Sequence, residues 1–364
     1  MHPLVPGDPA PPPAPAFTRD SRLMLIAPHP DDESLACGVI LQAAVRCGAA
    51  VRVVYATDVE NNPWPQRFME RKWRIHPADR RRWGQLRRKE AEAALLALGV
   101  EAESACFLGL PDQGLTDLLL HEPASLAATF SGLIDDFNPT DLIFPSTMDA
   151  HPDHNALAVL HHLLLRDRAS EAAAVAGWQF AVHGQNPIFL KNAGPFGASA
   201  AETAFKVKAI ECHVSQLLLS RKRFLRYAER PERFLAFDPA ALPGSNDSLQ
   251  ILSRQESGLV VRLSPQEHFF DREVILIALG HSEDGEFTST ALRSSPRSSR
   301  TSWQITLPTG EIFAPERPIF LKLCRRSLGF ADKGWCEAAA LVRPEAVADA
   351  SHNGVALHES LQGA

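Results

Sequence analysis

The sequence predicts an α/β fold: a Rossmann-like, mostly parallel sheet with helices on both faces, followed by a smaller all-β domain. From residue 22 to about 245, short apolar runs alternate with longer segments of helical spacing, which is typical of strands joined by covering helices. After the turn signal PGSND the apolar segments become short and closely spaced, which favours strands alone. The chain has 364 residues, 45% of them hydrophobic, and is long enough to form two folded units.

The first segments show the alternation most clearly. LMLIAP, beginning at Leu23, is a continuous apolar run of the kind that forms a strand buried on both faces, and the residues after it have helical length and spacing. The pattern repeats along the chain, with a long second helix that Gly99 closes. The predicted strands cover 23–28, 51–58, 105–110, 141–146 and 178–183, and the predicted helices cover 34–48, 81–99, 124–137, 154–166 and 201–220.

The second region is expected to consist of strands separated by polar breaks. These strands are predicted at 248–254, 258–264, 274–280, 302–308, 319–324 and 336–342, with a polar, mobile loop at 291–302. We therefore expect four segments: a disordered Pro-rich leader at 1–18, an α/β domain at 19–245, a β-sandwich-like domain at 246–345 and a flexible tail at 346–364.

Composition excludes several classes of protein. The 37 basic and 43 acidic residues leave a net charge of −6, so no overall field favours nucleic acid or an anionic membrane. The six cysteines are scattered without close pairs, which favours a reducing, cytoplasmic compartment. Neither a signal-peptide pattern nor an apolar run long enough to span a bilayer is present, so we expect a soluble protein without a transmembrane segment. The oligomeric state does not follow from these features.

Two clusters of histidine and aspartate each follow a predicted buried strand and precede a predicted helix. The first is PHPDDE at 28–33, and the second is HPDH at 151–154. One such cluster alone is more often a turn or a helix cap. Ligands of open parallel sheets bind beyond the carboxyl ends of the strands, so two clusters in equivalent places can meet there. Their joint presence therefore favours a composite metal site.

The residue types in these clusters suit a hydrolytic metal centre. Such a zinc ion needs three nitrogen or oxygen ligands and one open position for water, and His29, Asp32 and His154 supply two imidazoles and one carboxylate. Asp31 lies beside them as the expected general base. His151 is the expected donor to the oxyanion and, when protonated, could also give a proton to the departing amine. We predict zinc, although the same ligands also suit Fe²⁺.

Other histidines lack this context. His161 and His162 follow His154 by two helical turns, about 10 Å along a helix, which is too far to share its metal. We expect them to be packing or surface residues. No role is assigned to His76, His121 or His281.

The two clusters carry a resemblance to a known family. APHPDDESLACG resembles the first signature of the PIG-L/LmbE family of zinc-dependent deacetylases, and HPDHNA resembles the second. The similarity continues through RRKEAEAALLALGV, FLGLPDQGL and KVKAIECHVSQ, so it covers roughly residues 22 to 220. It implies that 19–245 is a deacetylase domain acting on N-acetylglucosamine-like conjugates, and the β-rich extension lies outside it.

The resemblance also implies roles for single residues. It assigns the metal ligands to His29, Asp32 and His154, the general base to Asp31 and the oxyanion-stabilising histidine to His151.

It further implies substrate contacts by Arg87, with Arg88 as a register-shifted alternative, and by Asp112. This chain departs from the family at Gln113, where a glycine is common, and at ATDVENN, where many relatives have a Gly-rich turn. Both departures concern the shape of the substrate site rather than the metal.

The stretch from Arg67 to Lys89 holds ten basic and two acidic residues. Three tryptophans lie in or beside it: Trp64, Trp73 and Trp83. Such a surface could attract a phosphate or stack on a sugar, and the alternative is a solvated helix face with Asp79 as N-cap. Nucleic acid is not expected, because the chain is acidic and has no recognised binding module. Trp303 and Trp335 could line a glycan groove, although core packing is the more frequent role of tryptophan in a strand.

The leading hypothesis is removal of an acetyl group from an N-acetylated aminosugar carried on a nucleotide, a lipid or a polysaccharide precursor. The nearest alternative is an amidase of the same fold that cleaves a non-acetyl amide, such as a thiol conjugate, because it needs the same metal and base. A hypothesis of another class is a glycan-binding protein with a residual metal site. The complete set of five site residues argues against that last hypothesis.

Overall fold

The computed structural model describes residues 13–169, 175–184, 186–239, 249–255, 258–263, 274–294, 303–325 and 335–338. The first region contains β1 (Arg22–Ala27), α1 (Asp32–Arg46), β2 (Ala50–Thr57), α2 (Pro63–Glu70), α3 (Pro77–Ala97), η1 (Ala102–Ser104), β3 (Ala105–Leu110), α4 (Leu115–His121), α5 (Pro123–Phe137), β4 (Asp141–Pro145), α6 (Pro152–Arg168), β5 (Ala176–Phe180), α7 (Pro187–Asn192), β6 (Gly194–Phe196), α8 (Ala200–Cys212), α9 (Val214–Leu225) and β7 (Glu232–Ala236). The second contains β8 (Leu249–Gln255), β9 (Gly258–Leu263), β10 (Val274–His281), β11 (Phe287–Ser294), β12 (Trp303–Leu307), β13 (Ile319–Arg325) and β14 (Trp335–Ala338).

The first region is built on a seven-stranded sheet in the order β3-β2-β1-β4-β5-β7-β6. The first five of these strands run parallel, whereas β7 pairs antiparallel with both β5 and β6. The predicted mostly parallel α/β fold is therefore confirmed. The chain leaves β1 toward β2 on one side and later places β4 on the other, so the loops after β1 and β4 flank one crevice.

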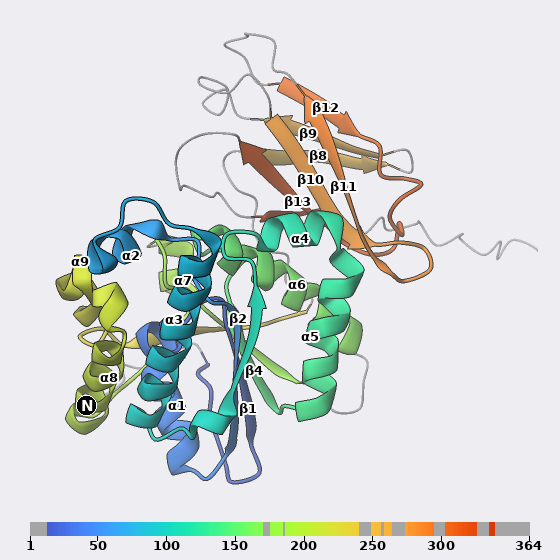
Figure 1. The fold of residues 1–364 in the computed structure, drawn as a ribbon. Coiled ribbons are helices and arrows are strands. Elements are labelled where there is room, and N and C mark those ends of the chain that lie inside the picture. Colours follow the sequence, from blue (N-terminus) through green and yellow to red (C-terminus); the bar gives the residue numbers. More distant parts are fainter. Residues whose placement is uncertain are drawn as a thin grey trace, which may run out of the picture.

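Helices cover both faces of this sheet (Figure 1). Leu23 and Leu25 of β1 pack with α1, α3 and α8, whereas Met24 and Ile26 pack with α5 and α6. All four side chains are fully buried. Because side chains alternate along a strand, a strand covered on both faces must be apolar at every position, which explains the continuous run in the sequence.

The segment predicted as one helix at 201–220 forms two helices, α8 and α9, because the chain bends at His213. The His213 Nε2 atom lies 2.8 Å from Oε1 of Glu33. Glu90 accepts hydrogen bonds from N and Oγ of Ser215 at 2.8 and 2.6 Å and so caps α9. Two buried carboxylates from distant parts of the chain thus outweigh the local helical periodicity.

Helix α3 begins earlier than predicted. His76 is its N-cap, Pro77 its first residue, and the Asp79 carboxylate reaches back to accept a hydrogen bond from the His76 amide at 3.0 Å. The prediction of Asp79 as N-cap is wrong, because it is the third residue of the helix. The remaining elements that the sequence does not predict are short or lie at sheet edges: α2, η1, α4, α7, β6, β7 and β11.

The second region contains two antiparallel sheets, β11-β10-β13-β14 and β12-β9-β8. Leu259 of β9 and Leu321 of β13 belong to one shared core, so the sheets pack on each other as a sandwich, and the all-β prediction is confirmed. β11 includes 291–294, where a mobile loop was predicted; the rest of that loop lies outside the described residues.

The four-stranded sheet is buried on both faces. Leu276 and Ala278 of β10 face the core of the sandwich, whereas Ile277 and Leu279 join the core formed by α5 and α6. Trp335 is also buried in that second core, as the packing alternative expected. The β region therefore packs tightly on the α/β region (Figure 1).

Most of the polar contacts between the two regions lie on α6, the helix that begins at the second His/Asp cluster, and one lies on α4, where the Leu120 carbonyl accepts a hydrogen bond from Ser289 Oγ at 2.6 Å. Lys322 Nζ donates to Oδ1 of Asn155 at 2.9 Å, and His281 Nε2 lies 2.8 Å from Oδ2 of Asp167. The β region thus supports the helix that carries one predicted metal ligand.

The predicted domain boundary at 245 and the tail at 346–364 lie outside the described residues, as does most of the leader. These boundaries stay predictions. In the described part of the chain, none of the helices combines the length and the apolar character that crossing a membrane requires. The cytoplasmic compartment also stays a prediction.

Candidate metal centre

The candidate site lies where β1 and β4 end. The loop after β1 is held against β2, because the Pro28 carbonyl accepts hydrogen bonds from N and Oγ1 of Thr57 at 3.0 and 3.1 Å. The next loop residues include Asp31, whose φ of 144° and ψ of −24° are unusual for any residue but glycine. Backbone strain of this kind tends to occur at functional sites.

Three donor atoms from the two loops face one another. His154 Nε2 lies 3.2 Å from His29 Nδ1 and 3.2 Å from Asp32 Oδ2, and His29 Nδ1 lies 3.4 Å from the same Asp32 oxygen. In a tetrahedral zinc site with bonds of about 2.0–2.1 Å, neighbouring ligand atoms are roughly 3.3–3.4 Å apart. The structure therefore brings the three predicted ligands together with the spacing that one metal ion requires.

A fourth histidine belongs to the same cluster. His183, which follows β5, has a ring nitrogen within 4.8 Å of the donor atoms of the other three residues. It is half-buried, whereas the other three are buried. Oδ1 of Asp32 is buried and has no hydrogen-bond partner among the described residues. An unsatisfied carboxylate oxygen beside two imidazoles fits a site built for a cation.

The protonation of these groups is strongly perturbed. Burial disfavours the charged form of His154, but the carboxylates of Asp149 and Asp32 raise its pKa to about 9. Burial acts to raise the pKa of Asp32, but His154 and His29 hold it well below its usual range. The proton on His154 places a positive charge beside the negative charge of Asp32, and a bound cation would place its charge in the same position.

Asp149 and Asp153 orient the two imidazoles, and sequence analysis assigned no role to either. Asp149 Oδ2 lies 3.1 Å from His154 Nδ1, and Asp153 Oδ2 lies 3.3 Å from His29 Nε2. A carboxylate on the far nitrogen of a metal-binding imidazole fixes its tautomer and orientation. A signal was available, because both acids belong to the segment DAHPDH that holds the second cluster.

Asp149 also ties the loop after β4 to the loop after β5. Its Oδ2 accepts hydrogen bonds from the amides of Val182 and His183 at 2.7 and 3.0 Å, and its Oδ1 accepts one from the His151 amide at 2.9 Å. One buried carboxylate therefore positions three residues around the cluster.

Asp31, the predicted general base, lies against Arg87. The Arg87 Nη2 atom is 3.1 Å from Oδ2 of Asp31 and also donates to the Pro30 carbonyl. Burial raises the pKa of Asp31, the Arg87 charge opposes this, and the nearby Asp32 charge adds to it. A raised pKa suits a carboxylate that has to accept a proton near neutral pH.

Glu33 joins the first loop to the break between α8 and α9. It accepts hydrogen bonds from the Asp31 amide at 2.9 Å and from Ser34 Oγ at 2.6 Å, besides its contact with His213. The sequence alone does not reveal a role for Glu33 or His213, because their contact joins residues 180 positions apart.

His151 is both the N-cap of α6 and a neighbour of the cluster. Its Nδ1 accepts a hydrogen bond from the Asp153 amide at 3.2 Å, so the neutral ring carries its proton on Nε2. Burial and the charges of His29 and His154 hold the pKa of His151 far below its usual value. The arrangement favours a neutral imidazole that donates a hydrogen bond over the protonated form expected from the sequence.

Asp112 lies at the edge of the cluster. Its Oδ1 is 3.6 Å from His29 Nε2, and its Oδ2 accepts a hydrogen bond from the Asn61 amide at 3.1 Å. Burial raises the pKa of Asp112 to about 6. Arg88, the alternative to Arg87, is instead paired through two nitrogens with the Asp58 carboxylate at 2.9 and 2.7 Å.

Both departures from the family pattern coincide with left-handed backbone. Val59, in ATDVENN, has φ 54°, and Gln113 has φ 61°. Glycine adopts this conformation without strain, whereas a β-branched valine does so at a cost. The conformation itself explains why glycine is common at such positions.

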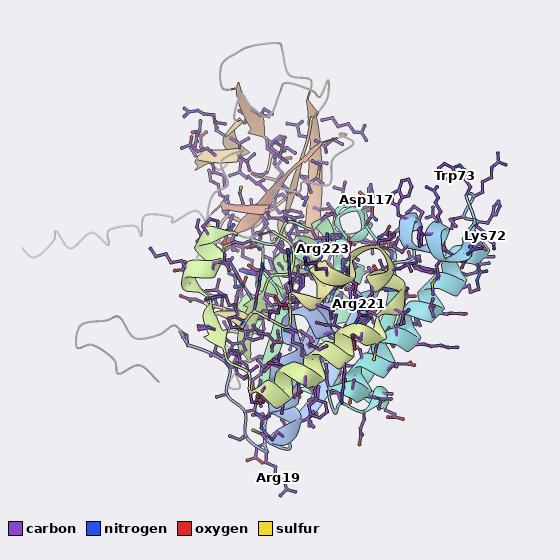
Figure 2. All side chains as sticks on the ribbon, turned by 90° about the vertical axis from the view of Figure 1, so that its left-hand side faces the viewer. Arg19, Lys72, Trp73, Asp117, Arg221 and Arg223 are labelled. Carbon is purple, nitrogen blue, oxygen red and sulfur yellow. The ribbon has the colours of Figure 1, made fainter. Side chains whose placement is uncertain are left out.

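The basic stretch between Arg67 and Lys89 covers the end of α2, the connecting residues 71–76 and the first part of α3. Trp83 is buried, whereas Trp64 and Trp73 are 60% and 76% exposed, with the Arg67 guanidinium 5.0 and 5.2 Å from their ring centres. Figure 2 shows Trp73 at the outer edge of the molecule. A role for this surface in sugar or phosphate binding stays a prediction.

His161 and His162 are buried, which confirms the packing alternative. His161 Nδ1 lies 2.7 Å from the Leu157 carbonyl, and His162 Nε2 lies 3.1 Å from Oε1 of Gln179. Neither belongs to the metal cluster.

Comparison with known proteins agrees with the motifs. Residues 24–163 match the family model PIG-L, described as GlcNAc-PI de-N-acetylase. The chain is 35% identical over 148 residues to the 1D-myo-inositol 2-acetamido-2-deoxy-alpha-D-glucopyranoside deacetylases of Mycobacterium sp. strains KMS and JLS. The match covers 36% of this chain and 46% of each relative, so the chain spans about half the length of the curated relatives it matches. The family resemblance is confirmed over the matched residues.

Solved structures with a similar chain path include deacetylases. A triple mutant of a deacetylase of teicoplanin biosynthesis is 22% identical, with a TM-score of 0.46, and the match covers 60% of this chain and all of that one. The N,N'-diacetylchitobiose deacetylase of Pyrococcus horikoshii is 18% identical, with a TM-score of 0.45, and the match covers 60% of this chain and 84% of that one.

Proposed function

We propose that this chain is a metal-dependent hydrolase that removes an acetyl group from an N-acetylated aminosugar conjugate. The observation that carries the proposal is the triangle of His29 Nδ1, Asp32 Oδ2 and His154 Nε2, with edges of 3.2 to 3.4 Å. The match of residues 24–163 to a de-N-acetylase family and the likeness to aminosugar deacetylases support acetyl removal as the reaction.

Zinc is the proposed metal, held by His29, Asp32 and His154. The set of two imidazoles and one carboxylate supports zinc and is also compatible with Fe²⁺. A bound ion of this type supplies a water of lowered pKa and polarises the amide carbonyl. The remaining steps belong to side chains of this protein.

Asp31 is proposed to take the proton of the attacking water. Its raised pKa and the contact of its Oδ2 with the Arg87 guanidinium support this role, because the guanidinium holds the carboxylate in one orientation. His151 is proposed to stabilise the oxyanion through Nε2–H, a role supported by the hydrogen bond that its Nδ1 accepts.

Arg87 and Asp112 are proposed to contact the substrate. Arg87 is fully buried, and its Nε and Nη1 have no hydrogen-bond partner among the described residues, so an acceptor brought in by the substrate would satisfy two donors that the protein leaves unpaired. Asp112, within 3.6 Å of His29, offers an acceptor near the reacting amide.

The test is acetate release from N-acetylglucosamine conjugates by the metal-loaded protein, with and without chelator. Acetate release should stop with chelator and in Asp31→Ala, and it should persist in Asp117→Ala, which removes an exposed aspartate of α4 (Figure 2). Cleavage of other amides without acetate release would identify the amidase instead. Glycan binding without any turnover would identify the binding protein.

A further inference from the structure

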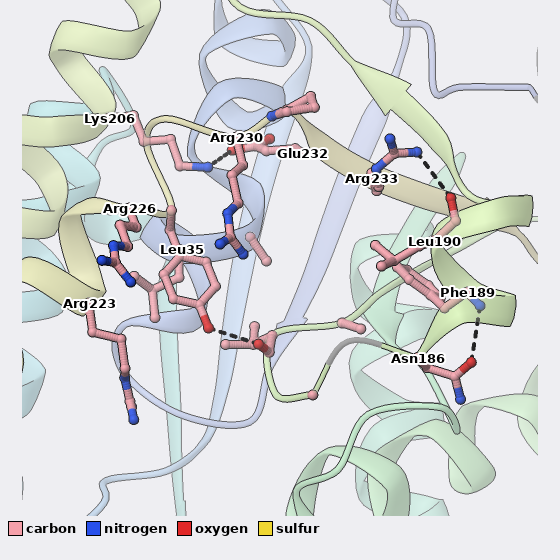
Figure 3. A pocket seen from close by; sticks show the side chains of 16 residues that line it. Leu35, Asn186, Phe189, Leu190, Lys206, Arg223, Arg226, Arg230, Glu232 and Arg233 are labelled. Atoms are coloured by element: carbon pink, nitrogen blue, oxygen red, sulfur yellow. Dashed lines mark hydrogen bonds and ion pairs between the residues drawn. The ribbon is translucent and has the colours of Figure 1, made fainter.

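A cavity lies beside the cluster of candidate metal ligands, between α1, α7, α9 and β7 (Figure 3). Its volume is about 570 Å³, and none of the proposed metal ligands or catalytic residues lines it. The wall is partly apolar, with Leu35, Ala36 and Phe189 among its residues, and one side is dominated by arginine. The cavity is large enough for a substantial part of a small-molecule ligand.

The charge of the cavity is strongly positive. Five basic side chains and one acidic side chain line it, a balance of +4 in a protein whose net charge is −6. The basic residues are Lys206, Arg223, Arg226, Arg230 and Arg233.

Two of these basic residues already have protein partners. Lys206 Nζ lies 2.6 Å from Oε1 of the buried Glu232, and Arg233 donates to the carbonyls of Leu190 and Ala193 at 3.2 and 3.0 Å. Both contacts hold lining residues of the cavity in place. Lys206 and Glu232 cancel each other in charge, whereas Arg233 contacts neutral carbonyls only. The excess of +4 therefore comes from the four arginines of the cavity.

Arg223, Arg226 and Arg230 have no carboxylate within ion-pair distance in the described part of the chain. Figure 3 shows their side chains on one side of the cavity, around Leu35. All three side chains are exposed, so water and salt screen the repulsion among their guanidinium groups, and an anion bound between them would remove the rest of it. Guanidinium binds phosphate through two parallel hydrogen bonds, which a cluster of arginines offers several times.

The cavity shares a wall with the metal cluster. Val182 and Gly184, which line it, flank His183, and Leu35 follows Asp32 by one helical turn. Tyr227 also lines the cavity and donates its hydroxyl to the Val182 carbonyl at 2.8 Å.

The pKa of the Tyr227 hydroxyl is affected both by a cavity arginine and by acids of the neighbouring cluster. Burial raises the pKa of the Tyr227 hydroxyl, and the Arg223 charge opposes this rise. The carboxylates of Asp149 and Asp32 raise the same pKa further, so the cluster acts on the cavity across their common wall.

We propose that the cavity bordered by Arg223, Arg226 and Arg230 binds a phosphate-like anionic group of the substrate, so that the acetylated sugar reaches the metal cluster from an anchored aglycone. This inference rests on the proposed function for its link to catalysis. The anion site itself depends on the cavity and on three arginines that have no carboxylate partner among the residues that the structure describes.

The first test measures binding without turnover. Calorimetry with inorganic pyrophosphate compares the wild-type protein with Arg223→Gln/Arg226→Gln/Arg230→Gln. Each lost charge-assisted contact is worth roughly tenfold in affinity, so the triple variant should bind at least about a hundredfold more weakly. Arg221→Gln is the matched control, because Arg221 lies on α9, is paired with Glu211 and does not line the cavity; Figure 2 shows it near Arg223.

The second test measures deacetylation of three acetylated substrates: N-acetylglucosamine 1-phosphate, a lipid-linked form of the same sugar phosphate in micelles, and neutral methyl N-acetylglucosaminide. The triple variant should raise KM for the phosphorylated substrates by about tenfold or more and leave the neutral substrate within about twofold. Preference for the soluble or the micellar phosphate identifies which source of phosphate the cavity serves.

The outcomes separate the two proposals. Turnover of all three substrates with unchanged KM in the triple variant would overturn the anion site and leave the proposed function intact. Pyrophosphate binding that depends on the arginines, without any deacetylation, would support the anion site and contradict the proposed function. Pyrophosphate binding that the triple variant retains, or that Arg221→Gln weakens equally, identifies an adventitious ion only. Single Arg226→Gln provides a milder variant, since exposed side chains seldom determine folding.

Discussion

The two regions of this protein bury polar side chains for different purposes. In the α/β region, buried acids and histidines converge on the ends of β1 and β4, where they face one another rather than solvent. In the described part of the β region, the buried polar residues are few, and two of them, His281 and Lys322, contact α6. The first region therefore assembles the chemistry, and the second supports the helix that carries part of it.

This contrast teaches where a substitution should affect function and where it should affect stability alone. A buried carboxylate at the cluster positions a ligand, so its loss should weaken metal binding. A buried polar contact between the regions holds two cores together, so its loss should lower the free energy of unfolding first.

The largest effect is expected at Asp149. Asp149→Asn keeps the size of the side chain and removes the charge beside His154 Nδ1, and it should lower metal affinity by about 10- to 100-fold. Competition with a chromophoric chelator measures this affinity. Asp141→Asn is the control, since Asp141 is a buried aspartate at the other end of β4; an equal loss there would mean that Asp149 acts only through the fold.

The link between the regions can be tested at Lys322. Lys322→Met leaves Oδ1 of Asn155 buried and without this donor, which should cost about 1–3 kcal/mol of unfolding free energy. Arg317→Met, at the same boundary but in a half-exposed pair with Asp167, should cost at most about 1 kcal/mol. Urea unfolding measures both. Equal costs would show that the buried contact has no special weight.

Acid should destabilise the α/β region through its packed histidines. Burial lowers the pKa of His161 to about 4 and of His162 to about 3, whereas a histidine in the unfolded chain titrates near 6.5. Below pH 6.5 the unfolded state therefore binds more protons, so stability is present above that pH and falls as the pH drops toward 4. The fall should be up to about 1.4 kcal/mol per pH unit for each histidine.

Thermal unfolding of the metal-free protein between pH 7 and pH 4 measures this slope. His161→Leu should make the slope shallower, since leucine fills the same apolar space and cannot take up a proton. An unchanged slope in that variant would assign the acid sensitivity to other groups.

The smallest expected effect is at Val59, in the loop that follows β2. Val59→Gly relieves a left-handed valine, worth about 1–2 kcal/mol, and adds flexibility to the unfolded chain, which costs about 0.4–1 kcal/mol. The net gain in unfolding free energy should be about 0.5–1 kcal/mol, measured by urea unfolding. Gln113→Gly should gain less, because glutamine tolerates this backbone better than a β-branched residue; a loss at Val59 would show that its side chain packs usefully.

The sequence predicts the fold of the first region well because each buried strand is a continuous apolar run and each loop cluster follows one. The cluster of candidate metal ligands could be predicted for the same reason, since His29 and His154 stand in short motifs at equivalent places in the chain. The bend at His213 escaped prediction because Glu33 and Glu90, distant in sequence, determine it. The cavity arginines escaped as well, because no local pattern separates them from a solvated basic helix.

The most direct test of the account is the metal content of the protein purified without oxygen, measured for the wild type and for His154→Ala. The account predicts close to one equivalent of zinc or iron per wild-type chain, with deacetylation in proportion to the metal, and loss of both in the variant. A wild-type protein that holds no metal under these conditions, or a variant that retains metal and activity, would contradict it.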